Sequence, residues 1–129
     1  MKLFIEKETL AEDVKRIFTT CYPFLKIELY KKQFADNNAT VKKEPVTSLN
    51  KLIYTKDKTV IDISYNVTVA ELENQFAVIG LVAEVFRKSG NVWVETSLTD
   101  NWTLQQQDEE AKEISKHFTE KNIALPNVY

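Results

Sequence analysis

The chain of 129 residues has 43% hydrophobic and 28% charged residues, a size and composition that fit one globular domain and exclude a disordered chain. Seventeen basic and nineteen acidic residues give a net charge of -2, which argues against a dedicated binder of nucleic-acid phosphates. The apolar runs are shorter than the roughly 18 residues of a membrane span, no signal peptide is evident, and the single cysteine, Cys21, can form no internal disulfide. We therefore expect a cytoplasmic protein without membrane contact.

The first part of the chain predicts a strand, a helix and a second strand. The stretch KLFIE (2–6) has the alternation of a short strand, and Thr9-x-x-Glu12 matches a capping box that begins a helix. Apolar residues at helical spacing follow, and Tyr22-Pro23 ends the helix because proline disfavours helical geometry in the preceding residue. In LKIELYKK (25–32) apolar and polar residues alternate, which predicts a strand with one buried face.

The middle of the chain predicts a connection. FADNNAT (34–40) follows directly on the second strand, without a hairpin partner. The segment 42–58 is rich in lysine and contains Pro45, and its stretch TSLNKLIY (47–54) is compatible with a short helical turn. We expect this segment to join two structured halves.

The second half repeats the order of the first. VIDIS (60–64) predicts a strand, and Thr68-x-x-Glu71 is a second capping box. Gly80 can end the helix in the left-handed conformation, after which LVAEVFRK (81–88) predicts another strand.

A hairpin strand and a helix follow the second repeat. SGN (89–91) predicts a tight turn into VWVETS (92–97), a strand that the first repeat lacks. Thr103-x-x-Gln106 is a third capping box, and an apolar stripe predicts a helix over about 103–120. The tail NIALPNVY (122–129) is apolar enough to dock on the domain, or frays at the end of the chain.

The repeated order indicates an internal duplication. The first two capping boxes align without a gap, and the strands 25–32 and 81–88 share one eight-residue pattern. We place the repeats at about 1–41 and 59–104 of a single domain, 1–129. The predicted fold class is α+β: a two-layer sandwich of two β–α–β-like repeats, a hairpin strand and a C-terminal helix. Its four- or five-stranded sheet carries helices on one face, in a ferredoxin-like or β-grasp-like arrangement.

Two resemblances bear on topology. TVAELENQF, the strand after it and TDNWTL resemble ubiquitin-like chains, in which a capped helix precedes a strand and an acidic turn. This likeness covers about 37 residues and lacks the leading hairpin of those chains. The whole chain also resembles small uncharacterised bacterial proteins with paired β–α–β segments. Neither resemblance implies a functional residue.

No catalytic, metal or cofactor site is predicted. His117 is interpreted as a cation near a helix C-terminus and Cys21 as a small buried hydrophobe, and no motif joins them as a dyad. A zinc site needs more ligands of this kind. The acidic cluster 107–113 fits a solvated helix face with i,i+4 ion pairs. Because Gly80 and Gly90 are the only glycines, no glycine-rich phosphate loop exists.

Three Asn-x-Thr triplets begin at Asn38, Asn66 and Asn101. In a secreted protein they would be glycosylation acceptors. They fall at predicted turns and helix starts, where Asn and Thr are favoured. We interpret them as turn residues.

The most informative residues lie on the second face of the repeated strands. Tyr30 and Phe86 occupy equivalent positions, and Trp93 lies on the strand expected to pair with that of Phe86. Such a face can stack RNA bases, but the RNP signature is absent and the net charge is negative, so nucleic acid is a disfavoured partner. Either the third helix covers these aromatics or they form a dimer or partner surface. Trp102, just before the third helix, is a further anchor candidate.

The sequence thus favours a non-catalytic binding or protein-interaction module over an enzyme. We expect it to bind itself or a protein partner through these four aromatic residues. The alternative is a small enzyme or ligand-binding protein with a pocket between helices and sheet, in which carboxylates such as Glu28 and Glu84 would act. The identity of a small-molecule ligand stays open.

Overall fold

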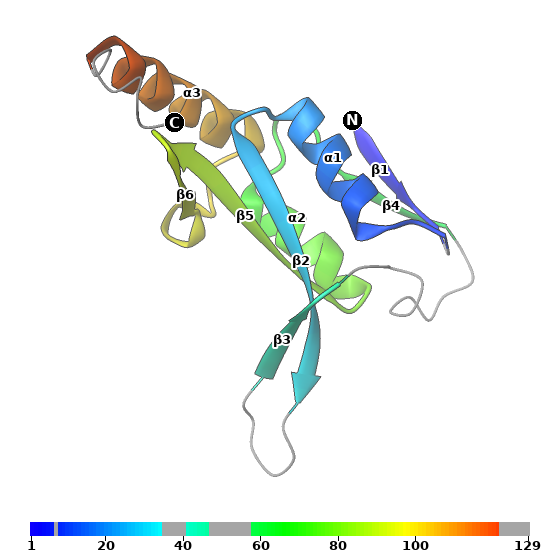
Figure 1. Cartoon of the computed structure of the whole chain (residues 1–129). Helices are drawn as coiled ribbons and strands as arrows, with labels where there is room; N and C mark the ends of the chain where they lie inside the picture. The colour runs from blue at the N-terminus through cyan, green and yellow to red at the C-terminus, as the bar shows by residue number, and fades with distance from the viewer. Residues whose placement is uncertain (7, 35–40, 47–57, 122–129) are drawn as a thin grey trace.

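The computed structural model describes residues 1–6, 8–34, 41–46 and 58–121. The described residues form an α+β structure with three α-helices and six strands (Figure 1). In chain order the elements are β1 (Lys2–Ile5), α1 (Ala11–Cys21), β2 (Leu25–Phe34), β3 (Val41–Pro45), β4 (Thr59–Asp62), α2 (Val69–Val78), β5 (Leu81–Ser89), β6 (Val92–Glu95) and α3 (Leu104–Lys121).

The strands form two antiparallel sheets. The larger has the order β3-β2-β5-β6, and the smaller consists of β1 and β4. The larger sheet has four strands, within the expected four or five, but β1 and β4 form a second sheet, so the expectation that a single sheet holds all the strands is wrong. Helix α1 lies between β1 and β2 (Figure 1), so these two strands cannot be neighbours. Each instead pairs with a strand of the other half, β1 with β4 and β2 with β5.

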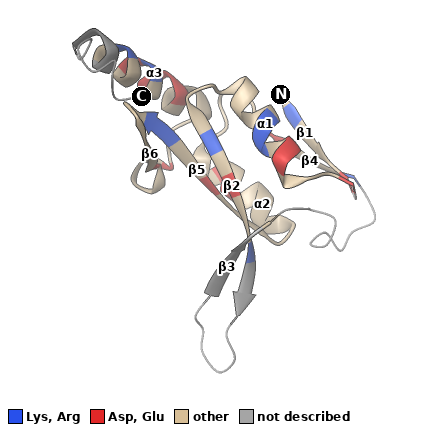
Figure 2. Cartoon of the chain, in the orientation of Figure 1, with Lys and Arg blue, Asp and Glu red and all other residues tan. Residues whose placement is uncertain are grey.

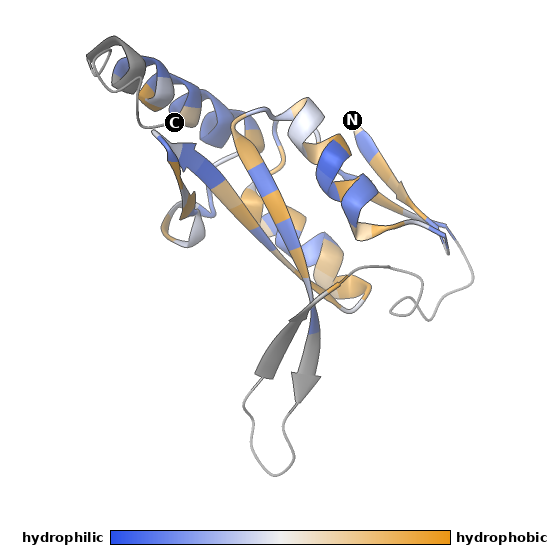
Figure 3. Cartoon of the chain, in the orientation of Figure 1, coloured by the Kyte–Doolittle hydropathy of each residue, from blue (hydrophilic) through white to orange (hydrophobic). Residues whose placement is uncertain are grey.

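Both sheets contribute to one hydrophobic core. Alternate residues of each strand point inward, which produces hydrophobic and hydrophilic bands along β2 (Figure 3). Helices α1 and α2 fill the space with side chains at helical spacing. The largest fully buried side chains are Phe18, Tyr22, Leu25, Ile27, Ile5, Ile61, Ile63, Leu72, Phe76, Leu81 and Leu104.

Tyr22 joins the two halves. It follows α1, is 1% exposed, and donates a hydrogen bond from its hydroxyl to the carbonyl of Ile63. Burial is the main cause that raises the pKa of this hydroxyl, and Coulomb repulsion from Cys21 adds to it. The hydroxyl therefore stays a donor throughout the physiological range.

The segment after β2 contains a strand that the sequence did not predict. Val41–Pro45 pairs antiparallel with Tyr30–Phe34, so β2 is part of a hairpin of its own. The predicted connection thus begins later than Lys42. The residues 35–40, with Asn38, the stretch 47–54 and the tail 122–129 lie outside the described residues.

Two of the three predicted capping boxes are present. The Thr68 hydroxyl accepts from the N–H of Glu71, and the Thr103 hydroxyl accepts from the N–H of Gln106. The box at Thr9 is wrong, because its hydroxyl accepts instead from the N–H of Glu6 and α1 begins after Leu10 without a side-chain cap. The Thr9 hydroxyl oxygen therefore closes a local turn with Glu6 and does not cap α1.

The first turns of α2 and α3 are fastened to each other. The N–H of Val69 donates to the carbonyl of Trp102 at 3.1 Å, and the N–H of Leu104 donates to the carbonyl of Val67 at 2.8 Å. These bonds satisfy backbone donors that a helix start leaves unpaired. They also fix where α3 leaves the domain.

Candidate functional site

The register of the larger sheet gathers three aromatic residues on one face. In antiparallel pairs, residues opposite each other point to the same side. Phe86 lies opposite Lys26 of β2 and Glu95 of β6, and the next pair outward joins Lys88 to Trp93. The face defined by these residues, here called the outer face, lies opposite the core. It consists of Lys26, Glu28, Tyr30, Val82, Glu84, Phe86, Lys88, Trp93 and Glu95.

Lys26 organises the centre of the outer face. Its ammonium nitrogen lies 5.2 Å from the ring centroid of Phe86 and 5.1 Å from that of Trp93. Such cation–π contacts contribute about 0.5–1 kcal/mol each at exposed sites. Trp93 remains 39% exposed, and Tyr30 is half-buried further along β2. Tyr30, Phe86 and Trp93 thus share one face.

Helix α3 packs on the core side of the sheet. The side chain of Gln107 accepts from the guanidinium of Arg87 at 3.1 Å, and Arg87 is opposite the buried Leu25. The carboxylate of Asp108 accepts from the N–H of Phe24 at 2.9 Å. In Figure 1, β2 and β5 pass in front of α2, and no described helix crosses before them. The sequence left open whether the third helix covers these aromatic residues. The described part of α3 does not cover the outer face.

Trp102 does not join the other three aromatics. Its ring lies 5.6 Å from the guanidinium carbon of Arg87, on the core side of the sheet. It borders a hollow of about 380 Å³ along α3, lined further by Gln106, Glu109, Glu110 and Glu113. The candidate residues therefore divide into two surfaces, and Trp102 stands alone on the second.

The carboxylates of the enzyme alternative lie on the outer face. Glu28 is opposite Glu84 in the register and forms an ion pair with Lys15 at 3.0 Å. Glu84 borders a hollow of about 330 Å³. The lining of that hollow is Glu73, Glu84, Val85, Glu95, Thr96 and Ser97. Glu28 does not line this hollow.

The single cysteine and the single histidine lie on different elements. Cys21 is half-buried at the end of α1, against the core, and His117 is exposed near the end of α3. Within the described ranges, no group of three or more Cys, His, Asp or Glu side chains could hold a metal ion.

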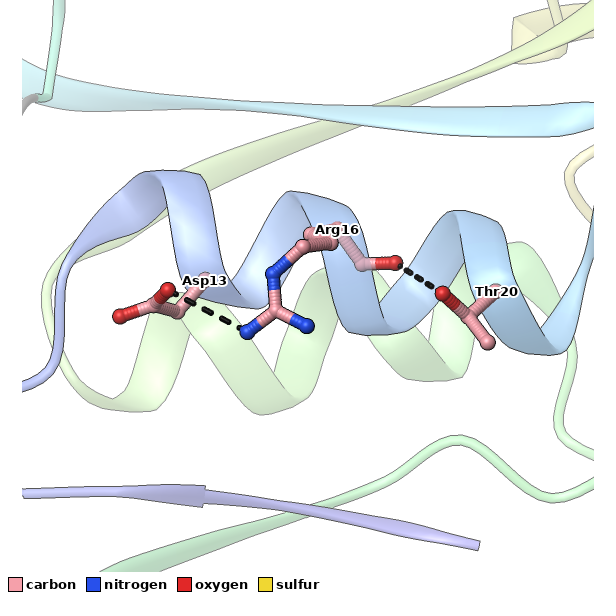
Figure 4. A network of polar contacts seen from close by, with 3 residues as sticks. All are labelled: Asp13, Arg16 and Thr20. Atoms are coloured by element: carbon pink, nitrogen blue, oxygen red, sulfur yellow. Dashed lines mark hydrogen bonds and ion pairs between the residues drawn. The ribbon is translucent and has the colours of Figure 1, made fainter.

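Polar side chains on the outward side of α1 bond to other groups of the same helix. Arg16 forms an ion pair with Asp13 at 3.4 Å, and Thr20 donates its hydroxyl to the carbonyl of Arg16 at 2.8 Å (Figure 4). These are local i,i+3 and i,i+4 contacts within one helix. This side of the molecule is an ordinary solvated helix face.

Charge is mixed on the larger sheet. Basic and acidic residues both occur along β2 and β5 (Figure 2). A nucleic-acid surface normally carries a stripe of one sign. The distribution therefore gives no support to a phosphate-binding face.

Strand β6, which was predicted as a hairpin strand, lies at the edge of the larger sheet. All four residues are exposed, with Val92 at 55% and Val94 at 38%. The run VWV in this strand lacks the polar alternation of a half-buried strand, and it predicts a hairpin strand without indicating how exposed that strand is. Leu98, three residues after the strand, is 97% exposed. An apolar edge thus borders the outer face.

No protein-family model matches the chain, and no curated protein or solved structure shows significant similarity to it. In the part of the chain that the structure describes, no helix is both long and apolar enough to cross a bilayer. Function is therefore inferred from the geometry of the surfaces.

Proposed function

We propose that this protein is a non-catalytic protein-interaction module that binds a second copy of itself or another protein through the outer face of its larger sheet. The observation that carries the proposal is that no described helix covers the sheet face of Lys26, Phe86 and Trp93, and that all four residues of β6 are exposed (Figure 1). The cytoplasmic location and a ferredoxin-like or β-grasp-like classification stay predictions.

The chemistry of the face supports a protein partner. Aromatic residues are enriched in protein interfaces, and tryptophan and tyrosine are enriched among their binding hot spots. Lys26 holds Phe86 and Trp93 in place before any partner arrives, which lowers the entropy cost of binding. Tyr30 extends the surface along β2, whereas Trp102 would belong to a separate contact.

The enzyme or ligand-binding alternative draws on the hollow beside Glu84. Of the six lining residues, three carry carboxylates (Glu73, Glu84 and Glu95), two carry hydroxyls (Thr96 and Ser97), and Val85 is apolar. Specific small-molecule sites are usually lined by apolar side chains with a few convergent polar groups. The outer face is therefore the better candidate for the binding site than this hollow.

The proposal is tested with two variants of the outer face and a matched control. Phe86→Ala and Trp93→Ala each remove an aromatic ring under Lys26. Phe4→Ala removes an exposed ring under Lys58, at 4.4 Å, on the smaller sheet. Sedimentation velocity over a concentration series should show self-association weakened by about tenfold or more in the first two, as for interface hot spots, and unchanged in Phe4→Ala.

A second readout covers a partner other than the chain itself. Affinity capture from a cell extract compares the proteins retained by the parent and by the same three variants. A strictly monomeric parent, together with an identical set of captured proteins for Trp93→Ala, would refute the proposal.

A further inference from the structure

Strand β6 is an edge strand with unusual exposure. It is the last strand of the order β3-β2-β5-β6, and no described segment pairs with its other side. Natural edge strands are normally protected by short length, lysine, proline, bulges or a covering element, and of these devices β6 shows its short length of four residues. The residues of β6 are Val92, Trp93, Val94 and Glu95, all exposed, with a single charge among them.

The hydrogen-bond pattern shows which backbone groups face that free side. The N–H of Thr96 donates to the carbonyl of Val85 at 3.2 Å, which marks a hydrogen-bonded pair with β5. Such pairs alternate along an antiparallel ladder. The N–H and C=O groups of Val94 therefore point to β5, and those of Trp93 and Glu95 point to the free side.

From this geometry we infer that β6 pairs antiparallel with β6 of a second copy of the chain, with Trp93 of each protomer opposite Glu95 of the other. The two four-stranded sheets would then join into one of eight strands. The inference rests on the proposed function and deepens it, because it names the partner and the contact. By symmetry, the outward groups of Trp93 and Glu95 would form four backbone hydrogen bonds.

Charge selects both the partner and the register. In this pairing Lys88, Trp93 and the partner's Glu95 lie in one row on the outer face, so the lysine and the carboxylate flank the indole. Their Cα atoms would be about 10 Å apart, since neighbouring strands are about 4.8 Å apart, and both side chains are long enough to approach each other.

The neighbouring registers lack this complementarity. A shift that places Trp93 opposite Trp93 puts Lys88 in one row with the other Lys88, and a shift the other way places Glu95 opposite Glu95. Like charges directly opposite each other are destabilising. The contact covers one short strand, so the dimer is expected to be weak and concentration-dependent.

A cysteine scan in a Cys21→Ala background tests the register. In the inferred pairing Val94 lies opposite itself in a non-hydrogen-bonded pair, where the Cα atoms are about 4.5 Å apart, within disulfide range. Val94→Cys should form a disulfide-linked dimer under mild oxidation several-fold faster than Trp93→Cys or Glu95→Cys. In those two variants the cysteines are diagonal neighbours at about 7–8 Å. Faster linkage of Trp93→Cys or Glu95→Cys would overturn the inference.

Backbone and charge variants test the contact in solution by sedimentation velocity. Glu95→Pro removes an outward N–H, which an edge strand tolerates, and should give a folded monomer. Lys88→Glu should weaken the dimer, and the double variant Lys88→Glu with Glu95→Lys should restore it. Failure of the charge swap to restore association, or full association of Glu95→Pro, would contradict the inference.

The outcomes separate this inference from the proposed function. If Trp93→Ala weakens association while Glu95→Pro and Val94→Cys have no effect, the outer face binds without strand pairing and the inference alone fails. If the parent chain stays monomeric at every concentration and Val94→Cys forms no disulfide, the second copy is not the partner. The capture experiment with the outer-face variants then decides the proposed function.

Discussion

At the scale of single residues, Asp108 shows what holds α3 away from the outer face. Its carboxylate accepts from the N–H of Phe24 at 2.9 Å, at the start of β2. Desolvation by burial is the main cause that raises its pKa; the Phe24 bond and Lys112 oppose the rise, and Glu109 adds to it. The charged form is therefore less favourable in the folded protein than in the unfolded chain.

This shift predicts a pH dependence of stability. A raised folded pKa means that the contribution of Asp108 is fully present below its unfolded pKa of about 3.9 and is lost as the pH rises through the folded value. Asp108→Asn keeps an acceptor for Phe24 but does not titrate. The unfolding free energy of the variant, relative to the parent, should thus increase from pH 4 to pH 7 in urea titrations.

The control for net charge is Asp13→Asn, which removes an exposed carboxylate on α1. It should not reproduce the rise. A relative stability of Asp108→Asn that falls over the same pH interval would mean that the charged carboxylate stabilises the fold, contrary to this account.

The positions of some single residues could be predicted from the sequence, and those of others could not. The positions of Tyr30, Phe86 and Trp93 on one face follow from the period of two along a strand and from the hairpin at Gly90 (φ 66°). The polar bond of Thr9 to Glu6 could not be predicted, because a hydroxyl can serve either a turn or a helix start. The sequence pattern is compatible with either hydrogen bond of Thr9, and the tertiary structure determines which of them forms.

At the scale of elements, the helix starts provide a matched set of variants. Thr68→Ala and Thr103→Ala each remove a hydroxyl that accepts from the first turn of a helix, and each should cost about 1 kcal/mol of unfolding free energy. Thr9→Ala removes a hydroxyl from an exposed turn and should cost less than about 0.5 kcal/mol. Urea unfolding of the three variants checks the order.

Equal losses in all three variants would show that Thr9 caps α1 after all. Equal stability in all three would show that packing, rather than capping, sets the ends of α2 and α3. Either result would contradict the hydrogen bonds described for these helix starts.

Strand β3 could not be predicted from its own residues. Strand β3 is Val41–Pro45, and its lysines and proline are typical of a solvated connection. Its strand character comes from pairing with residues 30–34 of β2, a contact distant from its own local pattern. The three helices, by contrast, carry strong local signals in their apolar spacing.

At the scale of the whole molecule, the two sheets and three helices that the structure describes share one core, and none of these helices covers the outer face of the larger sheet. The sequence left two arrangements for the third helix, over the outer face or away from it. The contacts that decide between them, Gln107 with Arg87 and Asp108 with Phe24, are long-range and polar. Local periodicity does not encode such contacts, so the sequence could not predict on which side of the larger sheet the third helix packs.

We propose that the outer face is where the protein binds its partner. The chain has two tryptophans, so Trp102→Phe leaves Trp93 as the sole indole on the outer face, and Trp93→Phe leaves Trp102 as the sole indole on the core side. Acrylamide quenching of each variant is measured over a concentration series of the protein.

If the outer face is buried on binding, the quenching of Trp93 falls and its emission shifts to shorter wavelength as the protein is concentrated, whereas Trp102 in the companion variant does not change. Quenching of Trp93 that is independent of concentration, with protection of Trp102 instead, would contradict the proposal.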